Sequence, residues 1–190
     1  MTTGTIILSL ATSVDGFIAA EDGGVEWLEE FESTKESDGK SESEGEGESG
    51  YDAFFADIDA LVMGANTYEQ VRSFGAWPYE DRPTYVLTHD DTEPVVDTAE
   101  TVEFVDEPVA DLALRVRDQY ASIWLVGGAQ VARAFLEARQ VDQLQLTIAP
   151  ILLGGGIRLF GTDGPRNRLK LEETTSLESG LVELRYGIQE

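Results

Sequence analysis

Two adjacent glycines, Gly127 and Gly128, separate an apolar run from a stretch with helical spacing in "LVGGAQVARAFLEA". A buried strand that ends in such a pair directs free backbone N–H groups and the positive end of a helix dipole at whatever lies there. An anionic ligand such as a diphosphate suits that position, although a plain tight turn would also use two glycines. The chain has neither G-x-G-x-x-G nor a Walker lysine, so the Rossmann and P-loop motifs do not apply.

A second junction of the same kind occurs in "ALVMGANTYE", where Gly64 ends an apolar strand before a helix that Asn66 or Thr67 is able to cap. Two strand–glycine–helix junctions in one parallel sheet lie at the same carboxyl edge. Open α/β sheets bind their ligands at that edge. The pair of junctions therefore favours a cofactor that carries phosphate.

Two further stretches follow apolar strands. In "SVDGFIA", Asp15 offers one carboxylate beside an apolar segment that would border a flat ring, and the alternative is a turn in which Asp15 bonds nearby backbone. Three consecutive glycines, Gly154 to Gly156, favour a flexible or bulged connection over ligand contact.

Composition excludes several functions. Acidic residues outnumber basic ones by 37 to 13 and are spread along the chain, and nucleic acid is an unsuitable partner because phosphate binding needs a basic stripe. Dispersed acids with only three lysines are typical of a cytoplasmic protein from a halophilic organism, where molar salt cuts the Debye length to about 3 Å. An ordinary acidic protein is the alternative.

The absence of cysteine and the single histidine, His89, argue against a metal site.

The elements that must position these residues alternate along the chain, as expected for a single domain over residues 1–190. Their order predicts a mixed, mostly parallel sheet with helices on both faces and antiparallel C-terminal strands. Residues 32–50 contain no apolar side chain and are predicted to be a flexible acidic insertion. No apolar run reaches about 18 residues, so we expect no membrane span. The predicted strands are 5–12, 60–64, 84–88, 102–105, 122–127, 142–150, 168–177 and 181–188, and the predicted helices are 51–58, 66–74, 108–120 and one after Gly128.

Three stretches together resemble a known family: "SVDGFIA", "VMGANTYE" and "IWLVGGAQVARAFLEARQVDQLQLTIAPILLGGGIRLF". They are similar to the dihydrofolate reductase-like superfamily, in the branch named for the C-terminal reductase domain of the riboflavin-biosynthesis deaminase/reductase (the RibD C-terminal domain). The resemblance covers nearly the whole chain except the acidic insertion. It implies an NAD(P)H-dependent reductase of a pyrimidine or pterin-like ring, usually acting as a homodimer.

The same resemblance implies the site residues. Residues around the nicotinamide, the adenosine half and the diphosphate would be Ile18, Ala19, Gly64, Ala65, Asn66, Thr67, Thr88, His89, Val126, Gly127, Gly128, Ala129, Gln130 and Val131. Residues near the substrate would be Trp27, Asp52, Phe55 and Pro150. Beside these, we predict that Asp15 is the catalytic polar group near the reacting centre, where an ionised carboxylate would orient or polarise the substrate through water and donating a proton would require a raised pKa.

One position departs from the family pattern, because Ala65 stands where the family commonly has an arginine. Such an arginine would pair with the 2′-phosphate of NADPH, so the choice between NADPH and NADH is open, with His89 and Arg72 as substitutes. The expected reaction is that of a 5-amino-6-(5-phosphoribosylamino)uracil reductase. The alternatives are a dihydrofolate reductase and a nucleotide-binding module without turnover.

Overall fold

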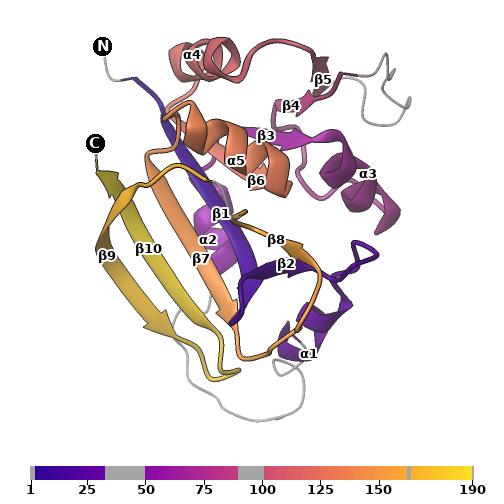
Figure 1. The fold of residues 1–190 in the computed structure, drawn as a ribbon. Coiled ribbons are helices and arrows are strands. Elements are labelled where there is room, and N and C mark those ends of the chain that lie inside the picture. Colours follow the sequence, from indigo (N-terminus) through magenta and orange to yellow (C-terminus); the bar gives the residue numbers. More distant parts are fainter. Residues whose placement is uncertain (1–2, 33–49, 90–100, 162–163, 190) are drawn as a thin grey trace, which may run out of the picture.

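An eight-stranded sheet forms the centre of the computed structural model, which describes residues 3–32, 50–89, 101–161 and 164–189 (Figure 1). The six strands from β5 to β7 are parallel, and β10 runs antiparallel to both β7 and β9. This arrangement confirms the predicted mixed sheet with antiparallel C-terminal strands. In spatial order the strands are β5 (Val102–Val105), β4 (Thr84–Leu87), β3 (Ala60–Gly64), β6 (Ser122–Gly127), β1 (Thr5–Ser13), β7 (Gln143–Ala149), β10 (Val182–Gln189) and β9 (Arg168–Ser176).

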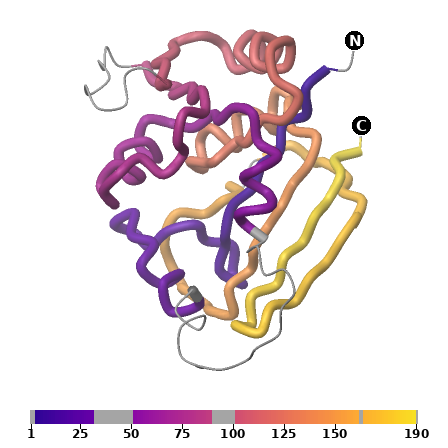
Figure 2. Tube along the Cα trace, turned by 180° about the vertical axis from the view of Figure 1, so that it is seen from behind, coloured from indigo at the N-terminus to yellow at the C-terminus, as the bar shows by residue number. Residues whose placement is uncertain are grey.

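Helices cover both faces of the parallel part, because its strands are apolar on both sides. In β1, Ile6 and Leu8 belong to one buried cluster and Ile7 to the other. Figures 1 and 2 show the sheet from opposite sides, with α5 in front in the first view and α2 in front in the second. The first cluster packs against α4 (Val109–Gln119) and α5 (Ala129–Glu137), and the second against α2 (Gly50–Ala56) and α3 (Ala65–Ser73).

Short elements that were not predicted surround the end of β1. The strands β2 (Phe17–Ala19) and β8 (Ile157–Arg158) form a separate antiparallel pair. A 3-10 turn, η1 (Glu26–Leu28), leads into α1 (Glu29–Glu32). Strands of two or three residues are too short to show an alternating pattern, so the sequence gives no periodic signal for them.

The predicted acidic insertion lies almost entirely outside the described residues. Glu32 ends α1 and Gly50 begins α2, and the prediction concerns residues 33–49 between them. Within the described ranges, no helix is both long and apolar enough to cross a membrane.

Candidate active site

Two helices begin where two neighbouring parallel strands end. β3 leads directly into α3 and β6 into α5, and the N-cap residues are Gly64 and Gly128. Neither N-cap makes a side-chain hydrogen bond, so the predicted capping by Asn66 or Thr67 is wrong: the helix starts one residue earlier than expected, at Ala65. The first N–H groups of a helix have no partner within the helix. Both helix starts therefore present backbone donors at the same sheet edge.

The two junctions also touch each other. A Cβ added to Gly64 would lie 2.9 Å from Val131 Cγ2, and one added to Gly128 would lie 3.1 Å from Thr67 Oγ1. Gly127 and Gly128 have φ values of +141° and +88°, which side chains other than hydrogen rarely tolerate. The tight turn alone thus requires both glycines. Binding of a ligand to the backbone here stays a prediction.

The other residues predicted to contact the diphosphate lie on either side of the glycine pair. Ala129, Gln130 and Val131 form the first turn of α5, while Val126 packs against the second buried cluster. The ladder between β3 and β6 shifts register here, since Val62 pairs with Leu125 and Met63 with Gly127. Such an irregularity interrupts the hydrogen-bond ladder and bends the strand locally. It occurs here at the sheet edge where the two helices begin.

The predicted adenosine side of the edge includes an ion pair. Thr88 donates its backbone N–H to the carbonyl oxygen of Val105 at 3.1 Å. His89 Nδ1 lies 2.7 Å from Asp106 Oδ1, and both side chains are exposed, by 96% and 70%. Arg72, the other substitute for the missing arginine, is in the last turn of α3, about 10 Å along the helix from Ala65. Of the two substitutes, His89 is thus already paired with a carboxylate and Arg72 lies at the far end of α3.

Three hydrogen bonds fix the side chain of Asp15. Its Oδ1 accepts hydrogen bonds from Ser13 Oγ at 2.6 Å and from the N–H of Leu153 at 3.1 Å, and its Oδ2 accepts one from the N–H of Gly154 at 2.8 Å. The hydroxyl bond first, and then the two backbone bonds, lower the pKa of Asp15 to about 2. The carboxyl is thus ionised at neutral pH, and the shift is opposite to the one that proton donation would require.

The predicted nicotinamide residues, Ile18 and Ala19, lie in β2. β8 pairs with this strand, and a Cβ on Gly156 would overlap the carbonyl oxygen of Ala19. Gly154 and Gly156 both have positive φ, a backbone conformation that favours glycine. The conformation of the loop therefore accounts for these two glycines, in line with the predicted structural role. The guanidinium of Arg158 lies 4.4 Å from the centre of the Phe17 ring. The strand that would border a nicotinamide is therefore fixed by Asp15 on one side and by β8 on the other.

The four predicted substrate residues lie in η1, in α2 and in the loop after β7, and none of them lines the cavity described below. Trp27 is buried, and its indole N–H has no partner within the described residues. Phe55 packs beneath Arg82, whose guanidinium lies 4.0 Å from the ring centre, while Asp52 is exposed in the first turn of α2. Pro150 is exposed beside the turn between β9 and β10, where a Cβ on Gly180 would contact it at 3.2 Å.

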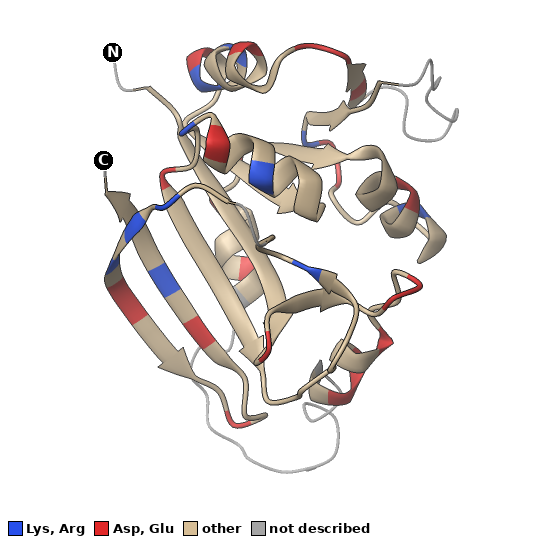
Figure 3. Cartoon of the chain, in the orientation of Figure 1, with Lys and Arg blue, Asp and Glu red and all other residues tan. Residues whose placement is uncertain are grey.

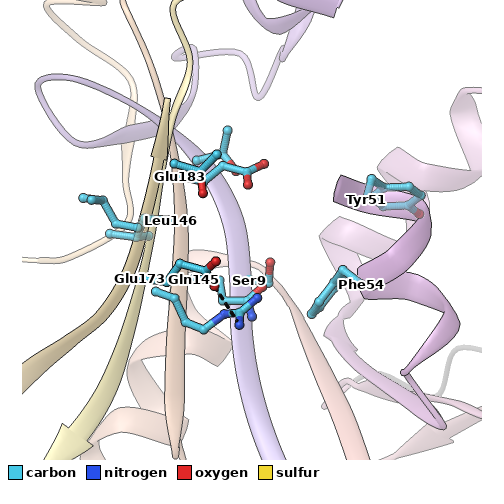
Figure 4. Close-up of a pocket in the computed structure, with 11 residues that line it drawn as sticks. Ser9, Tyr51, Phe54, Gln145, Leu146, Glu173 and Glu183 are labelled. Carbon is cyan, nitrogen blue, oxygen red and sulfur yellow. Dashed lines mark ion pairs between the residues drawn. The ribbon is translucent and has the colours of Figure 1, made fainter. Parts of the chain in front are cut away.

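A cavity of about 140 Å³ instead lies between α2 and the C-terminal half of the sheet (Figure 4). The residues of α2 that line it are Tyr51 and Phe54, and the sheet supplies mostly polar side chains. The sequence contained a signal for this surface, because "DQLQLTIAP" alternates and has one polar face, but nothing local identifies what lies opposite. The remaining lining residues are Ser9, Gln145, Leu146, Thr147, Glu173, Thr175, Glu183, Leu184 and Arg185.

Charged residues do not suggest a metal centre. Within the described residues, no three histidine or acidic side chains come together as metal ligands would. Figure 3 shows acidic residues distributed over several helices, strands and loops. The groups that gather at the strand ends are backbone N–H donors, which suit an anionic organic ligand.

Sequence comparison identifies relatives over nearly the whole chain. The family model described as the RibD C-terminal domain matches residues 4–182. The uncharacterized protein YwjB of Bacillus subtilis (strain 168) is 34% identical over 182 residues, which is 95% of this chain and 95% of that protein.

Structure comparison agrees with the sequence match. A Shewanella sp. PV-4 protein assigned to riboflavin biosynthesis has a TM-score of 0.81 at 28% identity, covering 98% of this chain and 99% of that one. Dihydrofolate reductase from Enterococcus faecalis, complexed with NADP(H), has a TM-score of 0.64 at 18% identity and covers 99% of this chain and 98% of that one. The second comparison shows that the fold is of the dihydrofolate reductase type.

Proposed function

Because the chain belongs to the RibD C-terminal domain family, we propose that it is an NAD(P)H-dependent reductase of a pyrimidine or pterin-like ring. The reaction we propose is the 5-amino-6-(5-phosphoribosylamino)uracil reductase type. The observation that carries the proposal is the pair of glycine-capped helix starts at Gly64 and Gly128, which touch each other at one sheet edge. A reduced nicotinamide cofactor, when bound, supplies a hydride.

The residues at this edge fit a dinucleotide. The N–H groups of the first turns of α3 and α5 would bind the diphosphate, since an anion there replaces the acceptors that the helices lack. Ala65, Thr88 and His89 would border the adenosine half, and Ile18 with Ala19 would border the nicotinamide. This division places the reacting end of the cofactor next to the short β2–β8 pair.

Asp15 acts in this proposal as a positioning residue. Its carboxylate joins the turn after β1 to the backbone of Leu153 and Gly154. That clamp holds β2 and the loop before β8 in one arrangement, and catalysis by positioning depends on such fixed geometry. Since its pKa is about 2, Asp15 supplies negative charge near the nicotinamide residues and no proton.

The test is oxidation of NADH or NADPH by purified protein in molar salt. 5-Amino-6-(5-phosphoribosylamino)uracil and dihydrofolate are supplied in separate reactions, and loss of the reduced-nicotinamide absorbance is followed. We expect turnover with the uracil compound. Turnover with dihydrofolate alone would support the dihydrofolate reductase alternative. Cofactor binding without turnover of either compound would support a nucleotide-binding module, and absence of cofactor binding would refute the proposal.

The resemblance also leads us to propose a homodimer in the cytoplasm of a halophilic organism. Sedimentation of the purified protein in molar salt tests the dimer directly. A monomer over the concentration range of the activity assay would exclude a dimer as the active form.

A further inference from the structure

The floor of the cavity beside α2 consists of two rows of side chains that cross four adjacent strands. Strand register sets these rows, because residues paired across a sheet point to the same face. The first row reads Ser9, Gln145, Arg185 and Glu173 across β1, β7, β10 and β9, and the second reads Ala11, Thr147, Glu183 and Thr175.

The opposite face of the same strands is apolar. Leu144 and Tyr186 belong to or pack on the first buried cluster. A sheet surface that is polar on one side only is usually open to water on that side. Here the polar side faces α2 across a cavity, with Phe54 projecting toward the sheet and Tyr51 on the same helix at the cavity's border (Figure 4).

The cavity thus has a hydrogen-bonding floor and an aromatic wall. Tyr51 is 48% exposed and Phe54 is half-buried, so both rings have surface available for a ligand. Aromatic side chains contact flat rings by offset or edge-to-face packing. Polar floor groups would meet the hydrogen-bonding edge of such a ring. A heterocycle with N–H donors and carbonyl acceptors matches this combination.

Glu183 differs from the other charged groups of the floor. Arg185 is paired with Glu173, with 3.0 Å between Nη1 and Oε2. Glu183 is half-buried, and within the described residues its carboxylate has no hydrogen-bond or ion-pair partner. Its neighbours in the row are Thr147 and Thr175. The floor therefore contains one anionic acceptor whose bonding capacity is unused.

We propose that Glu183 accepts hydrogen bonds from the N–H groups of the heterocyclic substrate in this cavity. The inference rests on the proposed function and names the residue that recognises the ring. The row of Glu183 crosses β1 at Ala11, two residues or about 7 Å before the strand end at Ser13, and Glu183 itself lies two strands, about 10 Å, from β1. A substrate whose ring binds Glu183 must therefore extend across β7 and along β1 for its other end to reach the cofactor residues.

The test compares two probes that differ at the two ring nitrogens, which carry hydrogen in one and methyl groups in the other. 5,6-Diaminouracil has both ring N–H groups, and 5,6-diamino-1,3-dimethyluracil has neither. Binding of each is measured by ligand-observed NMR in molar salt for the wild type, Glu183→Gln and Glu178→Gln. The last variant is the control, because it makes the same charge change at the exposed turn between β9 and β10.

We expect Glu183→Gln to weaken binding of 5,6-diaminouracil by about ten- to a hundredfold, the effect of losing a hydrogen bond to a charged group. Glu178→Gln should bind normally, and the dimethyl compound should bind weakly and equally to all three proteins. Equal binding of 5,6-diaminouracil to the wild type and Glu183→Gln would overturn the inference, as would its failure to bind the wild type.

Two further measurements keep the outcomes separate. Circular dichroism checks that Glu183→Gln is folded, and Thr147→Val provides a second variant that alters the same row. NADH binding, measured by fluorescence, reports on the proposed function independently of the ring probes. Loss of ring binding with intact NADH binding locates the effect in the cavity, whereas a wild type that binds the ring but no nicotinamide cofactor would refute the reductase proposal.

Discussion

Replacing Gly128 by alanine tests whether the glycine pair serves a ligand as well as a turn. The φ of +88° is unfavourable for alanine, and the new Cβ would lie 3.1 Å from Thr67 Oγ1. Strain of this kind costs about 1–3 kcal/mol. For a chain of this length each kcal/mol lowers Tm by about 2–4 °C, so the variant should remain folded but melt earlier.

The effect on ligand binding should be larger than strain alone explains. A shift of the backbone at Gly128 moves the first N–H groups of α5 away from the expected diphosphate. Losing a charge-assisted hydrogen bond weakens affinity by about ten- to a hundredfold. We therefore expect NADH binding to fall by at least that factor in a fluorescence titration in molar salt.

Gly75→Ala is the matched control for this experiment. Gly75 also has positive φ, +124°, but a Cβ there would meet nothing within 4 Å. It lies after α3, away from the strand-end edge. We expect Gly75→Ala to lower Tm while leaving NADH affinity unchanged. If Gly128→Ala binds NADH as tightly as the wild type does, the glycines serve only the turn, and the cofactor assignment at this edge is refuted.

Three other outcomes are expected. Ala65→Arg should raise NADPH affinity by about ten- to a hundredfold with little change for NADH; if the wild type already prefers NADPH by about a thousandfold, another group binds the 2′-phosphate. Dialysis to low salt should unfold the protein by circular dichroism, because the Debye length grows to about 30 Å at 0.01 M, and a native spectrum there would contradict the halophilic origin. Asp15→Asn should lower Tm at neutral pH. Because the pKa of Asp15 is lowered on folding, its stabilisation is present above the ordinary value of 3.8 and is lost as pH falls towards about 2, so the difference in Tm should shrink over that interval; a constant difference would refute the clamp.

The central sheet could be predicted because its signals are local. Strands such as β3 and β6 are continuous apolar runs followed by glycine and a helical pattern, and both were found at their observed positions. Helix starts were less well predicted: the polar residues Asn66 and Thr67 suggested capping, but the chain bends earlier, where Gly64 packs on Val131. Tertiary contact between two junctions decided that boundary, and no single segment encodes it.

The cavity could not be predicted, because it depends on register between distant strands. Glu183 faces Thr147 only through the pairing of β10 with β7. In the hairpin of β9 and β10, the register shifts between Arg185 and Tyr186. The orientation of α2 is likewise a result of packing. The ring of Phe55 packs against the guanidinium of Arg82. Tyr51 and Phe54 of the same helix line the cavity.

The position of β1 in the sheet has a consequence for synthesis. Its two neighbours in the sheet are β6 and β7, which are both synthesised much later. For example, the N–H of Ile6 donates a hydrogen bond to the carboxylate of Asp142, which is 136 residues further along the chain. At a translation rate of 5–20 residues per second, this delay is about 7–30 s. For most of that time β1 has neither ladder partner on the ribosome, because β6 is completed only at Gly127 and β7 only after it. We expect folding to be limited by this late closure, and nascent chains that stop before β7 to require chaperone binding at β1.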